Sequence, residues 1–230
     1  MKNLQRVFGM IASITAILIL LISAIEIGAY CDYGWYEKEY AKYDVLEDLE
    51  MEMKDVMCVT EEMMAYLRGN RADLVVDTIV AGEEREFFNE REKAHMVDVK
   101  NLFIGGLWIR RIAILLFALA VVAMIKTKAD WKRLLPKSFL IGLCAFAGVT
   151  AGVGLLFLSD FNKYFLMFHE VFFDNDLWLL DPRTDLLIRM LPEGFFLDMV
   201  VRIGIIFLLL LLVGVVISIV ALYTQRNKNN

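Results

Sequence analysis

Four long apolar runs divide this chain, and polar segments separate them. The runs cover about residues 7–29, 102–125, 139–158 and 203–223, and apolar residues make up 59% of the 230 positions. Each run is close to the roughly 20 residues that a helix needs to cross a bilayer. The pattern predicts an all-α or mainly α membrane protein with four transmembrane helices.

The first run does not fit a cleaved signal peptide. Its apolar core is longer than the roughly 7 to 15 residues of a signal sequence. The sequence at residues 28–31 also lacks the leucine and small-residue pattern of a lipoprotein cleavage site. We therefore expect the first run to remain as a membrane span.

The basic residues near the spans predict the orientation of the chain. They lie before the first span, between the second and third, and after the fourth: Lys2, Arg6, Lys126, Lys128, Lys132, Arg133, Lys137, Arg226 and Lys228. Cytoplasmic loops are rich in lysine and arginine, so we expect both termini in the cytoplasm. The segments at about 30–101 and 159–202 then form an extracytoplasmic cap, which holds 27 of the 29 acidic residues. We treat residues 1–230 as a single membrane domain.

Charged residues near the outer ends of the spans have two interpretations. Arg110 and Arg111 interrupt the second run, and Glu26 lies near the end of the first. Such groups are costly in a bilayer unless they are paired or reach the headgroups. They either anchor the helices at the headgroups or line a polar cavity that receives a lipid headgroup.

The cap is predicted to be mainly helical. Helix formers dominate from Glu37 to Leu67, and Gly69-Asn70 is the one clear break that the sequence indicates. Residues 74–80 form a short β-branched run that suits a strand or a helix. Residues 87–100 should form a helix that continues into the second span.

The chain has two histidines, and both fall in the cap. Arg91, His95 and Asp98 share one face of the predicted helix, so Asp98 is placed to orient His95 or stabilise its charge. His169 lies among phenylalanines at helical spacings, which predicts an apolar pocket and a neutral imidazole. The plainer alternatives are a solvated helix for His95 and a membrane-surface helix with an incidental His169.

Several chemistries fit the sequence poorly. The residues around His169 lack the second histidine of a zinc-protease helix, and no second Glu-x-x-His pairing matches the one that ends at His95, so we expect no metal site and no cofactor. A Gly-x-Ser-x-Gly motif is absent, and Ser159 is the one serine in the cap segments.

Cys31 and Cys58 are the cap thiols; they are free, paired, or a minor candidate for an acyl-carrying nucleophile. No phosphate-binding loop or basic patch supports binding of nucleotides or nucleic acid. Histidine-assisted chemistry at the outer membrane face remains.

Three blocks of the sequence resemble the lipoprotein intramolecular transacylase (Lit) family of Gram-positive bacteria. They are EFFNEREKAHMVDVK at residues 86–100, FHEVFF at 168–173 and WLLDPRTD at 178–185. The resemblance covers nearly the whole chain, and the segment between Cys31 and Val80 matches least. It implies transfer of the sn-2 acyl chain of a diacylglyceryl lipoprotein to the α-amino group of its own N-terminal cysteine. The product would be a lyso-form lipoprotein, made at a bacterial cell membrane.

In that family the two matching histidines, His95 and His169, are the proposed catalytic pair. Our hypothesis makes His169 the base and lets His95, steadied by Asp98, stabilise the oxyanion, although the two roles could be exchanged. Asn89 and Arg91 are candidates for positioning the ester or the peptide backbone. The expected substrate-binding residues are Phe165, Phe172, Trp178 and Asp181.

Two other classes of function stay open from the sequence. A non-catalytic membrane receptor or assembly factor would bind a partner through the acidic cap. A small-molecule transporter is less compatible, because the inner spans lack paired helix breaks and midplane charges.

Overall fold

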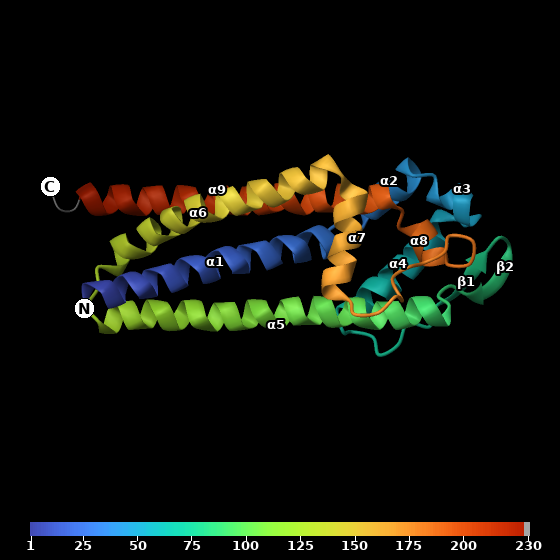
Figure 1. Cartoon of the computed structure of the whole chain (residues 1–230), viewed down its shortest axis with the longest axis horizontal. Helices are drawn as coiled ribbons and strands as arrows, with labels where there is room; N and C mark the ends of the chain where they lie inside the picture. The colour runs from blue at the N-terminus through green and yellow to red at the C-terminus, as the bar shows by residue number, and fades with distance from the viewer. Residues whose placement is uncertain (228–230) are drawn as a thin grey trace. The chain divides into compact units, whose positions relative to one another are not determined.

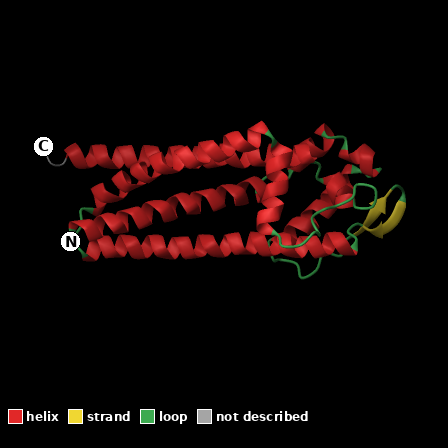
Figure 2. Ribbon diagram, viewed as in Figure 1, coloured by secondary structure: helices red, strands yellow, loops and turns green. Residues whose placement is uncertain are grey.

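The computed structural model describes residues 1–227, without the side chains of residues 150, 153, 157 and 158; Lys228, one of the expected cytoplasmic cations, lies outside the described residues. The prediction of a mainly helical protein with four long apolar helices is confirmed (Figures 1 and 2). These helices are α1 (Lys2–Tyr30), α5 (Glu90–Lys126), α6 (Trp131–Ser159) and α9 (Glu193–Asn227).

The chain folds as two compact units. The span unit comprises residues 1–27, 107–159 and the chain from 202 onward, and the cap unit comprises residues 28–106 and 160–201. The cap unit therefore consists of the two polar segments that separate the apolar runs, extended by a few residues. Helices α1, α5 and α9 each contribute residues to both units.

Helix α1 is the common partner in the span unit. One cluster of buried side chains joins it to α6 and α9: Ile17, Ala24, Phe139, Phe207 and Leu211. A second cluster joins it to α5 through Ala12, Ala120 and Met124. Many other apolar side chains of α5 and α9 are exposed, as expected for helix faces that contact lipid.

Glycines let α1 and α6 approach closely. A Cβ atom at Gly142 would lie 2.1 Å from Oγ of Ser13, and one at Gly9 would lie 2.3 Å from Oγ of Ser138. Both distances are far below van der Waals contact, so the absence of a side chain sets the spacing of these helices. Small residues serve the same purpose in many membrane helix pairs.

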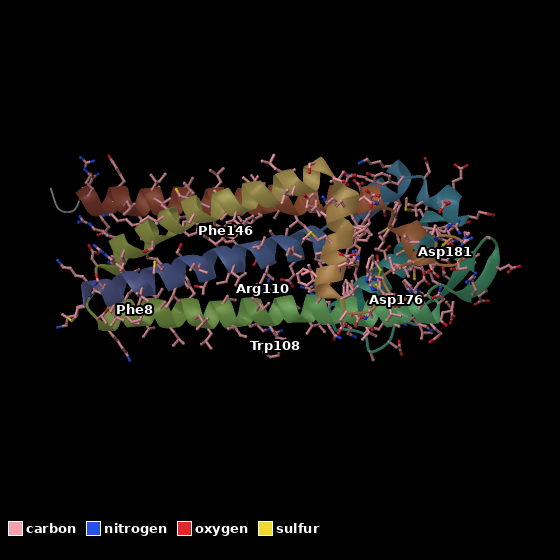
Figure 3. The ribbon with its side chains drawn as sticks, in the orientation of Figure 1. Phe8, Trp108, Arg110, Phe146, Asp176 and Asp181 are labelled. Carbon is pink, nitrogen blue, oxygen red and sulfur yellow. The ribbon has the colours of Figure 1, made fainter. Side chains whose placement is uncertain are left out.

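The charges near the cap ends of the spans are compensated inside the span unit. The guanidinium of Arg110 on α5 forms an ion pair with Glu26 and lies 3.5 Å from Oγ of Ser23, both on α1. The guanidinium of Arg111 lies 4.8 Å from the ring of Trp108, on the same helix. Figure 3 labels Trp108 and Arg110 beside α5. Pairing and stacking of this kind lower the cost of keeping charge near lipid.

The first part of the cap contains three helices where the sequence indicated one continuous helical region. They are α2 (Gly34–Lys42), α3 (Val45–Leu49) and α4 (Met53–Leu67). The prediction of a single break was wrong because Asp44 and Glu50 adopt left-handed backbone conformations, each with φ of 52°. Nothing in their local sequence signals this, since glycine is the usual residue there. The two turns bring Val45 and Leu49, each 1% exposed, into the core of the cap.

The β-branched run ends in a hairpin, so the strand alternative is the correct one for its last four residues. Strands β1 (Asp77–Val80) and β2 (Glu83–Glu86) pair antiparallel, with Val80 opposite Glu83. The two-residue turn between them has positive φ at both Ala81 and Gly82. That geometry matches the right-handed twist of a hairpin.

Two further helices complete the cap: α7 (Phe161–Phe172) and α8 (Leu186–Met190). The core of the cap collects side chains from α2, α3, α4, the hairpin, α8 and the start of α9. Phe87 and Phe88, which precede α5, are almost completely buried in this core. They fix the start of α5, and with it the turn of helix that carries His95.

Replacement of Gly142 by leucine should destabilise the protein. The new side chain has no room beside Ser13, and overpacking of this kind costs about 1–3 kcal/mol. Gly148→Leu on the same helix is the matched control, because a Cβ at Gly148 meets nothing within 4 Å. Thermal unfolding in detergent measures the difference, and equal stability of the two variants would contradict this account of α1–α6 packing.

Candidate functional site

The structure brings the two histidines together inside the cap unit. His95 lies on α5 and His169 lies on α7, and their ring centroids are 6.2 Å apart. The residues are only 7% and 8% exposed, respectively. Two imidazoles from distant parts of the chain therefore share one largely dehydrated site.

The backbone of α7 determines which nitrogen of His169 carries a proton in the neutral ring. Nδ1 lies 2.7 Å from the carbonyl oxygen of Phe165, one helical turn earlier. A carbonyl can only accept, so Nδ1 donates, and Nε2 of the neutral ring holds the free lone pair. His169 is thus prepared to accept a proton at Nε2.

Aromatic rings enclose His169 on several sides. The ring of Trp178 stacks on the imidazole at a centroid distance of 4.9 Å and an interplanar angle of 27°. Phe165 and Phe168 make edge contacts at 4.4 Å and 5.5 Å. Phe173 lies 5.6 Å from His169 and 5.4 Å from His95, so it bridges the two histidines.

Burial favours the neutral form of both imidazoles. It lowers the pKa of His95 to about 4, with a further lowering from the neighbouring His169 and a smaller opposing effect from the charge of Asp98. Burial also lowers the pKa of His169, although the hydrogen bond to Phe165 opposes it. At neutral pH the site therefore holds two uncharged imidazoles that can accept or donate hydrogen bonds.

One polar atom of the site is left without a partner by the described residues. Nδ1 of His95 is buried and makes no hydrogen bond with any of them. An unsatisfied buried polar atom costs about 1–3 kcal/mol. A carbonyl or amine of a bound molecule would satisfy Nδ1, which makes it the atom of this site that most directly indicates a ligand.

Asn89 begins α5 through a reciprocal capping arrangement. Its side-chain oxygen accepts from the backbone N–H of Glu92 at 3.0 Å, and its own N–H donates to Glu92 at 2.7 Å. Its amide also donates to Asp185 at 2.7 Å. These contacts give Asn89 a structural role at the start of α5.

Glu92 was not among the residues singled out from the sequence, although it is completely buried. Its second carboxylate oxygen accepts from the backbone N–H of Leu187 at 2.6 Å, at the start of α8. Burial raises its pKa. The sequence does contain a signal for this role of Glu92. An asparagine that is followed three residues later by an acidic residue resembles a helix capping box.

The loop after α7 is tied to the same face of α5 that carries His95. Asp98 accepts from the side-chain amide of Asn175 at 2.9 Å, and Arg91 donates to the carbonyl of Asp176, with an ion pair of 3.7 Å to its carboxylate. The indole N–H of Trp178 donates to the carbonyl of Asn175 at 2.8 Å. Arg91 and Asp98 therefore hold the loop whose tryptophan covers His169.

Two of the predicted substrate-binding residues, Phe172 and Asp181, contact neighbouring residues of the chain. Phe172 packs on Phe168 at 4.6 Å and is 54% exposed. Asp181 accepts from the backbone and side chain of Arg183, which hold the pKa of its carboxyl at about 2. Asp181 stabilises the turn before α8, and Asp176 and Asp181 lie in the same connecting segment (Figure 3).

Metal ligands and thiols are the other reactive residue types that the sequence raised. No group of three or more histidine, cysteine or acidic residues among the described residues could hold a metal ion. Cys31, Cys58 and Cys144 are free and exposed in the structure. The two buried imidazoles, with ring centroids 6.2 Å apart, are the candidate site on geometric grounds.

Comparisons with known proteins find one family model and similar solved structures. The family model described as lipoprotein intramolecular transacylase Lit matches residues 10–196. A structure of the membrane-integral Lit from Bacillus cereus is similar with a TM-score of 0.81 at 19% identity, covering 98% of this chain and 99% of that one. Structures of the same protein with one histidine replaced by arginine or by alanine have TM-scores of 0.78 and 0.79 at 19% identity; coverage is 99% and 98% of this chain, and 96% of each of those. Among curated proteins, none matches the chain.

Titration of the two imidazoles should show the effect of burial. His95 should stay neutral at pH 6 and gain its proton near pH 4. The unfolded chain takes up this proton near pH 6.5, so the free energy of unfolding should fall as pH drops from about 6.5 to about 4. NMR of histidine-labelled protein measures both rings, and the variants His95→Gln and His169→Gln assign the signals. Titration of His95 near pH 6.5 would show that its site is hydrated.

Proposed function

Because the chain belongs to the lipoprotein intramolecular transacylase (Lit) family of integral membrane acyltransferases, we propose that it moves an acyl chain within a diacylglyceryl lipoprotein. The acyl group leaves the sn-2 oxygen of the glyceryl moiety and joins the α-amino group of the N-terminal cysteine. The product is the lyso form of the lipoprotein. The single observation that carries the proposal is the pair of buried, neutral imidazoles with ring centroids 6.2 Å apart.

The reaction needs proton transfer and orientation more than a strong nucleophile. The attacking amine and the ester belong to one substrate molecule, so the enzyme mainly holds them in contact. A free α-amino group has a reference pKa of about 7.7 to 8.0, so some of it is already neutral at physiological pH. A buried neutral histidine is a suitable acceptor for the proton that the amine loses during attack.

In our mechanism His169 moves the proton and His95 stabilises charge. The amine nitrogen forms a bond to the ester carbonyl carbon while Nε2 of His169 accepts a proton from the nitrogen. Nδ1 of His95, protonated in the neutral ring, donates to the oxyanion of the tetrahedral intermediate. The intermediate then breaks its bond to the sn-2 oxygen, which takes the proton from His169. The products are an amide and a free hydroxyl, and the two histidines return to their starting state.

Neighbouring residues support this chemistry by position. The hydrogen bond from His169 to Phe165 leaves Nε2 free, which favours His169 as the base. The buried, unpartnered Nδ1 of His95 favours that ring as the donor to the oxyanion. Asp98, Arg91 and Asn175 fix the loop that carries Trp178. Phe165, Trp178 and the exposed Phe172 would contact the acyl chains.

The positive-inside pattern supports an orientation with both termini in the cytoplasm and the histidine pair on the outer side. The substrates are then diacylglyceryl lipoproteins that are anchored in the outer leaflet of a bacterial cell membrane. The proposed steps use the residues of the chain without a cofactor. A receptor or assembly factor with an acidic cap is the alternative, and it would not depend on the imidazoles.

Removal of either imidazole should abolish the reaction. We expect His95→Gln and His169→Gln each to lower conversion to the lyso form by at least about 100-fold, the usual contribution of a positioned acid or base. The assay is mass spectrometry of a lipoprotein in a host that lacks other N-acylation. Glu170→Gln is the matched control, because it changes the exposed neighbour of His169. Normal conversion by both histidine variants at equal abundance would exclude this mechanism.

Asn175→Ala should reduce turnover more mildly, by about 10-fold, because it releases the loop and leaves both imidazoles in place. Asn162→Ala is the control, since Asn162 also donates to one carboxylate, that of Glu193, at 2.9 Å. Asp98→Ala in the Asn175→Ala background should add little, because the two residues act as one unit. The expected loss is in kcat, with KM nearly unchanged. Fully additive effects of the two substitutions would refute a joint role.

A further inference from the structure

Helix α7 exposes apolar side chains that the cap does not cover. Four of its twelve residues are large, apolar and exposed: Leu166 (41%), Met167 (53%), Val171 (68%) and Phe172 (54%). Across all described residues of the cap unit there are ten such side chains, so one short helix holds four of them. An exposed apolar concentration of this kind marks a surface that contacts a partner or a membrane.

Two of these four side chains group with half-buried Tyr164 on one side of the helix. At about 100° per residue, Tyr164, Met167 and Val171 lie within an arc of about 60°, which we call the outer flank. Phe161 and His169 are buried on a different side. Exposed Lys163 and Glu170 lie within about 20° of each other and form a narrow charged strip beside the outer flank.

We propose that α7 lies along the surface of the bilayer on the cap side, with its outer flank in the boundary between headgroups and acyl chains. Amphipathic helices with one polar strip and one apolar face bind lipid surfaces in this way. The ammonium of Lys163, on the strip, lies 5.6 Å from the ring of Tyr164, on the far edge of the outer flank. A lysine on the strip suits the lipid phosphates, while the tyrosine suits the interface.

Chain connectivity brings this helix to the membrane. α7 begins at Phe161, two residues after the spanning helix α6 ends at Ser159. Consecutive Cα atoms are about 3.8 Å apart, so the first turn of α7 lies within about 8 Å of the end of a spanning helix. The start of α7 therefore cannot lie far from the end of that span.

The size of the flank argues against a protein partner. A stable protein interface buries about 1,000 Å² or more in total, and three side chains on two turns of helix cannot supply that area. A lipid surface has no such threshold, because the spans already hold the protein in the bilayer. A second copy of the chain or another protein is therefore an outcome that the test must exclude.

The depth of α7 in the bilayer also sets the depth of His169, a step that rests on the proposed function. His169 lies between Met167 and Val171 in sequence and on the opposite side of the helix. A fixed depth of the outer flank then fixes the depth of the imidazole. The ester of a diacylglyceryl group also lies near the boundary between headgroups and acyl chains, so helix and substrate would meet at one level.

Spin labels can measure the depth directly. The full chain, with Cys31, Cys58 and Cys144 replaced by serine, would receive one cysteine at Met167 or Val171 in nanodiscs that hold a single copy. Collisions of the label with oxygen, which concentrates in lipid, are compared with collisions with a water-soluble nickel chelate. Glu170→Cys on the charged strip and Ile79→Cys on the exposed side of β1 are the controls.

We expect oxygen to dominate at positions 167 and 171 and the nickel chelate to dominate at positions 170 and 79. Val171→Glu should shift a label at position 167 toward the nickel chelate, because a charge withdraws the flank from lipid. Equal nickel access at positions 171 and 79 would overturn the proposal, and so would shielding from both reagents, which indicates a protein cover. None of these readings uses activity, so they stand or fall separately from the transacylase assay.

Discussion

The buried carboxylate of Glu92 is the contact on which the geometry of the cap depends. It is completely buried and accepts backbone N–H groups from Asn89, at the start of α5, and from Leu187, at the start of α8. Two segments far apart in sequence are thus joined one turn before His95. A buried carboxylate that lost these donors would remain as an unpaired charge, so the contact specifies one arrangement of the two helices.

The histidine site combines two requirements that oppose each other. Aromatic burial keeps the imidazoles neutral and lowers the pKa of His95 to about 4. Packing against these rings restricts rotation of the imidazoles, but only a hydrogen bond selects the tautomer. For His169 the carbonyl of Phe165 and the stacked ring of Trp178 supply that restraint. Nδ1 of His95 has no such partner among the described residues, so a hydrogen bond at Nδ1 restrains His169 and not His95.

Features that depend on periodicity and composition can be predicted from this sequence. Features that depend on tertiary contact cannot. The four long helices follow from runs of apolar residues, and the histidines were selected because the chain has two. The turns at Asp44 and Glu50 escaped, because only packing of the core makes a positive φ acceptable there. Asn175 was not predicted either, because nothing in its local sequence indicates a hydrogen bond to Asp98, 77 residues earlier. The functional residues were visible as residue types, whereas the residues that hold them were not.

The loop that ends at Trp178 joins the helix of His95 to the ring of His169. It makes hydrogen bonds with the helix and an aromatic contact with the ring. Arg91 and Asp98 bind the loop from the helix of His95, and Trp178 stacks on His169 from the other end. A shift of α5 is therefore transmitted to His169 through two hydrogen-bonded contacts and one aromatic contact. Under the proposed function, a substrate would reach both imidazoles at once, because their ring centroids are 6.2 Å apart, and the loop helps to set that spacing. The two charged residues near His95 would then act mainly by holding the loop, and through it the separation of the imidazoles.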